Sequence, residues 1–220
     1  MLKSKIVLGV FILFLLGGCN VLGQKDISEM DPAELPDVIA FQDDFTREFM
    51  SSLEEVEDGY YLFESKTGGY TMMYPENAKM DQLFYESTGD NYEYIQFGEN
   101  EETNNYTYYV RATYNAGSIA SDLRGLQGIL AAHTGYEGDY EASEYEDKTI
   151  HFATTEYVTQ SGESTTNRFL VIVMSNDSDQ AVSIRYNVIS DNNKDNNINL
   201  NNIKKEVMSI MESIEFKMEE

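Results

Sequence analysis

The chain has 220 residues, with 39 acidic and 15 basic side chains and a formal net charge of −24 at pH 7. A chain this acidic repels phosphate backbones, so its charge argues against nucleic acid as a partner. The chain has one cysteine, which excludes intramolecular disulfides and metal sites built from several thiolates. We therefore expect the hydrophobic core alone to hold the fold.

The first residues have the pattern of a secretory signal: two lysines, an apolar run over residues 6–16, and then two glycines. The run of about eleven residues is too short for a membrane span, which needs ~20. Its end, Leu16-Gly17-Gly18-Cys19, resembles the lipobox of bacterial lipoproteins. The resemblance implies that residues 1–18 are a signal peptide removed before Cys19. It also implies a diacylglyceryl group on the Cys19 sulfur and a further acyl chain, commonly palmitate, on the new amino terminus.

Lipid on Cys19 would place the mature chain on the extracytoplasmic face of the cell membrane. Two or more acyl chains, at ~0.8 kcal/mol per buried methylene group, anchor a protein stably. We expect no cofactor other than this covalent lipid. An ordinary secretory signal that happens to contain a cysteine is the alternative.

Two segments precede the predicted domain. Residues 19–35 have few apolar side chains and no periodicity, which predicts a flexible acidic tether. In residues 36–58 apolar side chains recur at steps of three or four, which predicts an amphipathic helix. We expect its apolar face to pack on the domain. In the alternative interpretation, Phe41, Phe45 and Phe49 bind an envelope protein.

Residues 59–220 are predicted to form one α+β domain with a single antiparallel sheet flanked by helices on both faces. Helical spacing occurs over 118–133 and 200–215. Residues 169–174 are apolar on both faces, as in a strand inside a covered sheet. The predicted strands are residues 60–64, 70–74, 82–87, 92–97, 106–114, 139–145, 149–158, 167–174 and 181–189.

Two stretches of this domain resemble the PsbP-like fold. They are Gly69-Tyr70-Thr71-Met72-Met73-Tyr74-Pro75 and the closing Ser213-Ile214-Glu215-Phe216, with a helix between them. That fold occurs in photosystem II extrinsic proteins and in bacterial lipoproteins. The resemblance implies an antiparallel sheet flanked by helices, and it supplies no catalytic residue.

One loop is a weak candidate for calcium. Asp191, Asn193 and Asp195 have the spacing of the first ligands of an EF-hand loop. Asn196 replaces the usual sixth-position glycine, and Asn202 replaces the bidentate glutamate. A solvated turn is the favoured interpretation, and we expect no metal site. His133 and His151, the only histidines, do not share a metal-ligand spacing, so we expect structural roles for both.

The chain lacks a nucleophile elbow, a phosphate loop and a dinucleotide fingerprint. We therefore expect a protein that is not an enzyme. The predicted function is a membrane-anchored binding or accessory module that meets an unknown ligand or an envelope protein. The alternative is a cell-envelope hydrolase whose catalytic carboxylates the sequence does not identify.

Overall fold

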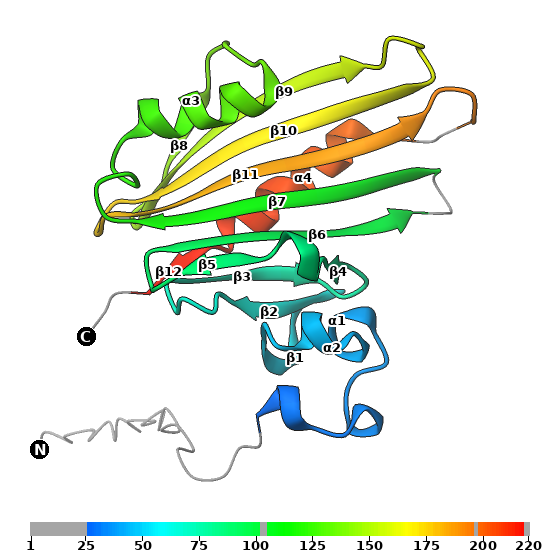
Figure 1. Ribbon diagram of the computed structural model, residues 1–220, viewed down its shortest axis with the longest axis vertical. Helices are drawn as coiled ribbons and strands as arrows, with labels where there is room; N and C mark the ends of the chain where they lie inside the picture. The colour runs from blue at the N-terminus through cyan, green and yellow to red at the C-terminus, as the bar shows by residue number, and fades with distance from the viewer. Residues whose placement is uncertain (1–25, 102–104, 196–197, 218–220) are drawn as a thin grey trace, which may run out of the picture.

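The computed structural model describes residues 26–101, 105–195 and 198–217, so the lipobox and Cys19 lie outside the described part. Antiparallel strands dominate it, and they form two sheets that lie one above the other in Figure 1. Helices α3 (Leu123–Thr134) and α4 (Leu200–Glu212) lie against the upper sheet. The chain is therefore richer in strand than an even α+β mixture.

The larger sheet has the strand order β4-β6-β7-β11-β10-β9-β8, with β5 paired to β6. The antiparallel pairing predicted for this region is confirmed. Most predicted strands are present, with ends shifted by up to four residues; 82–87 is instead a helical turn, η3 (Gln82–Phe84), followed by β5. The strands are β4 (Lys79–Met80), β5 (Glu86–Thr88), β6 (Tyr92–Glu101), β7 (Tyr106–Ala116), β8 (Glu141–Glu144), β9 (Lys148–Val158), β10 (Ser164–Ser175) and β11 (Gln180–Asp191).

Strand β10 has apolar side chains on both faces and lies between β9 and β11, inside the sheet. Leu170 and Ile172 pack with helix α3 (Leu123–Thr134) in one apolar cluster. Val171 and Val173 point the other way, because side chains alternate along a strand. They belong to the main core with helix α4 (Leu200–Glu212).

The expected single sheet is wrong, because four further strands form a second, smaller sheet. Its order is β1-β2-β3-β12, and its strands are β1 (Met50–Glu57), β2 (Tyr60–Glu64), β3 (Tyr70–Pro75) and β12 (Glu215–Phe216). Its inward side chains, such as Phe63 and Tyr74, share the main core with Val110 and Val171 of the larger sheet. The two sheets therefore bury one common core, to which α4 also contributes.

The predicted amphipathic helix over 36–58 is also wrong. Two four-residue helices, α1 (Ile39–Gln42) and α2 (Asp44–Arg47), are followed by strand β1. The Asp43 carboxylate accepts a hydrogen bond from the Thr46 backbone N–H and starts α2 as its N-cap. Asp58 and Gly59 form the two-residue loop of the β1–β2 hairpin, with Gly59 at φ +77°. Pairing with β2 thus overrides the helical spacing of the apolar residues.

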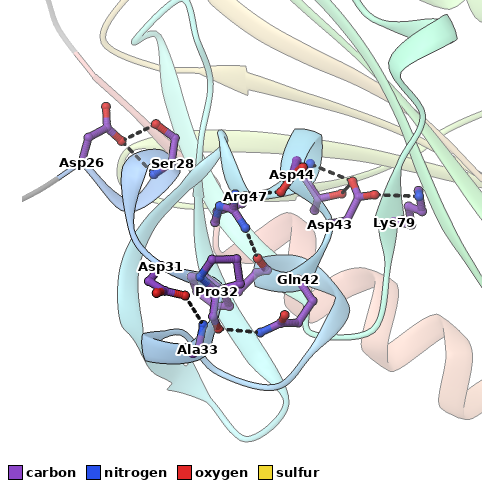
Figure 2. Close-up of polar contacts among 12 residues, drawn as sticks. Asp26, Ser28, Asp31, Pro32, Ala33, Gln42, Asp43, Asp44, Arg47 and Lys79 are labelled. Carbon is purple, nitrogen blue, oxygen red and sulfur yellow. Dashed lines mark hydrogen bonds and ion pairs between the residues drawn. The ribbon is translucent and has the colours of Figure 1, made fainter.

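The part of the predicted tether that the structure describes is held against the domain (Figure 2). Its helical turns η1 (Ile27–Glu29) and η2 (Pro32–Glu34) are capped by the carboxylates of Asp26 and Asp31. The Gln42 side-chain amide donates a hydrogen bond to the Pro32 carbonyl, 3.2 Å away. Ile27 and Leu35 are only 9% and 8% exposed. Burial of these two side chains explains why residues from 26 onward do not form a free tether.

We expect Val171→Asp to unfold the protein. An unpaired carboxylate at this fully buried position costs several kcal/mol, against a total stability of ~5–15 kcal/mol. Circular dichroism during urea denaturation measures the effect. Val158→Asp, at an exposed strand end, is the matched control and should unfold near the wild-type midpoint. A Val171→Asp protein as stable as this control would contradict the position of β10 in the core.

Candidate functional site: a cavity between helix α3 and the sheet

A cavity of about 420 Å³ lies between α3 and the larger sheet. Its floor comes from β6, β7 and β11, whose registers align the side chains in rows. Tyr94, Thr113 and Ser183 form one row, and Gln96, Arg111 and Arg185 form the next. Of the second row, the two arginines line the cavity. The floor is therefore polar on the same face from which Leu170 and Ile172 contact α3.

Helix α3 covers one side of the cavity. The Asp122 carboxylate caps its first turn by accepting a hydrogen bond from the Gly125 N–H, 3.0 Å away. Gly135 ends it in the left-handed conformation, at φ +72°. Between these ends, Leu126 and Leu130 are buried, and Ile129 is 50% exposed. The helix thus gives the cavity an apolar wall, and its last turn adds His133.

Positive charge gathers at this cavity without a matching carboxylate. Arg111 and Arg185 are directly opposite each other on β7 and β11, an arrangement that destabilises a sheet. In the described part of the chain, none of the ion pairs joins Arg111, Arg168 or Arg185 to an acid. Glu86, exposed on β5, is the acidic residue of the lining. In a chain of net charge −24, two adjacent guanidinium groups that no acid pairs with in the described residues are unusual.

The neighbouring charges perturb the protonation of the site. Burial lowers the pKa of Arg185, and the nearby Arg111 and Arg168 lower it further, while Tyr94 and Tyr109 raise it. The charge of Arg185 lowers the pKa of His133, with smaller contributions from burial and from Arg111. Because the pKa values of Arg185 and His133 are both lowered, the cavity disfavours additional positive charge. A bound anion would relieve this repulsion.

A hydroxyl on the cavity floor has no partner. Ser183 is 6% exposed, and its Oγ makes no hydrogen bond to the protein. Buried polar atoms are normally paired, so the Ser183 hydroxyl is a candidate hydrogen-bonding group for a ligand in this cavity. Arg111 keeps its position through a 2.7 Å hydrogen bond from Nε to the Gln96 side-chain oxygen. Its guanidinium carbon also lies 5.5 and 5.2 Å from the ring centroids of Phe84 and Tyr109, so the group is held at the edge of the cavity.

Similarity to known proteins identifies the family. A family model described as "Putative lipoprotein YvcA" matches residues 36–215. The chain belongs to this family. It is 34% identical over 155 residues to the Bacillus subtilis protein named "Putative lipoprotein YvcA". That match spans 64% of this chain and 64% of the Bacillus protein.

Solved structures are similar at lower levels. A mutant of the protein Mog1 aligns over 71% of this chain and 95% of its own, with 13% identity and a TM-score of 0.46. LpqN from Mycobacterium tuberculosis, described as involved in cell envelope biogenesis, aligns over 72% of this chain and 91% of its own. Its identity is 10% and its TM-score 0.35. The resemblance to PsbP-like proteins is not confirmed by these comparisons.

The structure places the predicted binding phenylalanines of this YvcA-family chain in or beside the core. Phe41 and Phe49 are 0% and 1% exposed, so neither can contact a partner while the domain is folded. Phe45 is partly buried and packs edge-on against Phe49, with ring centroids 5.3 Å apart. The helical face that would have offered them to a partner does not exist. Cys19 lies outside the described residues.

The calcium candidates form a turn. The Asp191 carboxylate accepts a hydrogen bond from the Asn193 backbone N–H, 2.9 Å away, and also faces Lys194. The Asp195 carbonyl accepts a hydrogen bond from the Asn105 amide. Within the described ranges, no cluster of three or more His, Cys, Asp or Glu side chains could hold a metal ion. The arrangement fits a solvated Asx turn.

The cavity residues are those that sequence reasoning missed. His133 was expected to have only a structural role, and Arg111, Thr113 and Arg185 were not singled out. His133 is instead exposed and lines the cavity. The available signal was the scarcity of arginine: only five occur, and three are in strands. That signal does not show which strands are neighbours.

We expect Arg185→Met to stabilise the ligand-free protein by about 0.5–2 kcal/mol, since methionine keeps the apolar stem and removes the repulsion with Arg111. Urea denaturation at low salt measures the change, which should shrink as salt screens the charges. Arg124→Met, on the exposed surface of α3, changes the net charge equally and serves as the control. If Arg185→Met unfolds at a lower urea concentration than this control, repulsion between Arg185 and Arg111 does not destabilise the protein.

Proposed function

We propose that this chain is a membrane-anchored extracytoplasmic lipoprotein, and that its domain binds a small ligand, without catalysis, in the cavity beside α3. The observation that carries the binding role is the cavity with Arg111, Arg185 and the unpaired Ser183. Its volume of about 420 Å³ falls within the usual ~300–1,000 Å³ of small-molecule sites.

Family membership and the lipobox resemblance support the anchor. The family and its Bacillus member both carry the word lipoprotein in their names. Within the described ranges, no helix combines the length and apolar character that a bilayer crossing requires. Attachment would then depend on lipid at Cys19, with the domain outside the cytoplasmic membrane.

The chemistry of the cavity favours binding over catalysis. Arginine stays protonated and cannot act as a general base near neutral pH. The charge of Arg185 lowers the pKa of His133, and in the part of the chain that the structure describes neither a hydroxyl nor a carboxylate hydrogen-bonds to this histidine. Paired guanidinium groups are well suited to hold a charged ligand in one orientation.

We expect Cys19→Ala to release the protein from the membrane fraction of its native host, because the thiol is the proposed attachment point for lipid. Fractionation followed by intact mass measurement detects both the release and the loss of acyl mass. Gln24→Ala, which lies after the proposed cleavage point, should leave fractionation unchanged. If Cys19→Ala stays in the membrane and is processed normally, the anchor is wrong.

Native mass spectrometry tests the binding role. The chain purified from its host should carry a noncovalent small molecule that is released unchanged. Arg185→Met should lose this adduct, whereas Arg124→Met should keep it. An adduct-free wild-type protein would contradict the binding role, and conversion of the released molecule by the protein would support a hydrolase instead.

A further inference from the structure

We infer that the cavity recognises a small organic anion: a carboxylate or phosphate group carried by an apolar or ring-shaped body. This inference rests on the proposed binding function and names the chemical class of its ligand. Both parts of the ligand follow from how the lining is divided, with cations and hydroxyls on the sheet and apolar side chains on α3.

The anionic group fits between the two arginines. Arg111 and Arg185 are register partners on adjacent strands, so both guanidinium groups arise from one row of the floor. A guanidinium group donates two parallel hydrogen bonds to a carboxylate or phosphate. Ser183, one row away on the same face of β11, offers a further donor whose Oγ has no protein partner. An anion at this place would face both guanidinium groups, with the Ser183 hydroxyl beside them.

The body of the ligand fits the opposite wall. Leu126, Ile129 and Leu130 line the α3 side, and the rings of Tyr92 and Tyr94 belong to the β6 edge of the floor. Half-exposed Ile129 would lose contact with water when an apolar body covers it, and this burial favours binding. A bare inorganic anion would leave this wall uncovered. We therefore expect an organic anion to bind more tightly than inorganic phosphate.

A dissolved anion suits the chain better than the headgroup of an anionic lipid bilayer. Headgroup phosphates are presented on a negatively charged surface, and the mature chain without residues 1–18 would carry a net charge of −26. The two surfaces repel each other once they approach within a Debye length of ~8 Å. A small dissolved anion meets much less of this repulsion, because it enters the cavity alone.

Isothermal titration of the full chain in detergent, at low salt, tests the ligand class. The probes are phenyl phosphate, inorganic phosphate and uncharged benzyl alcohol. Phenyl phosphate should bind most tightly, and benzyl alcohol should not bind measurably. Arg111→Met and Arg185→Met should each weaken phenyl phosphate binding by about tenfold or more, as expected for loss of hydrogen bonds to a charged group. Arg124→Met should bind like wild type.

Two further measurements decide between the remaining outcomes. Arg185→Lys keeps the charge but loses the forked donor, so an affinity between those of wild type and Arg185→Met is expected. Equal binding of phenyl phosphate by wild type and both methionine variants would overturn the inference. Cys19→Ala protein is also sedimented with phosphatidylglycerol vesicles. If this sedimentation depends on Arg185, the cavity binds a lipid headgroup, and the inference of a dissolved ligand is wrong.

The outcomes also separate this inference from the proposed function. A neutral or cationic adduct on the native protein, together with no binding of phenyl phosphate, would refute the anion and leave the binding role intact. The absence of any adduct would refute the binding role itself. The ligand class is supported if the wild-type protein binds phenyl phosphate more tightly than inorganic phosphate and if both methionine variants weaken the binding of phenyl phosphate.

Discussion

The uninterrupted register of β7, β11 and β10 is the constraint on which the rest of the structure depends. Each strand pairs residue by residue over eleven positions. Because side chains alternate, a slip by one residue would exchange the two faces of a strand. It would move Val171 and Ile184 out of the main core and turn Arg185 into it. The same register that buries the core therefore also creates the arginine pair.

The sequence predicts most of this sheet because its strands are long and their patterns local. Residues 169–174 are apolar on both faces, which correctly places them inside a covered sheet. The phenylalanines at 41, 45 and 49 led to the wrong prediction of a helix over residues 36–58, because their spacing fits a helix. The pairing of β1 with β2 decides the structure there instead. The Asp58-Gly59 hairpin signal was present and is stronger evidence for a strand pair than the spacing is for a helix.

The candidate site was much harder to predict, because it depends on which strands become neighbours. Arg111 and Arg185 are 74 positions apart and meet only through the pairing of β7 with β11. Their repulsion works against folding, as does the unpaired Ser183 hydroxyl. Local patterns reflect what stabilises an element. A group that is kept at a cost to stability leaves little trace in them, and the structure is needed to reveal it.

The docked N-terminal segment sets how an anchored molecule would stand on its membrane. Between Cys19 and Asp26 the chain can extend at most ~25 Å, so the domain would remain close to the bilayer. The segment attaches beside β1 and β2, whereas α3 lies at the other end of the long axis (Figure 1). Anchored copies would thus turn the small sheet toward the lipid and α3 outward. Their mutual repulsion would keep neighbours apart, leaving each cavity open to solutes arriving from outside the cell.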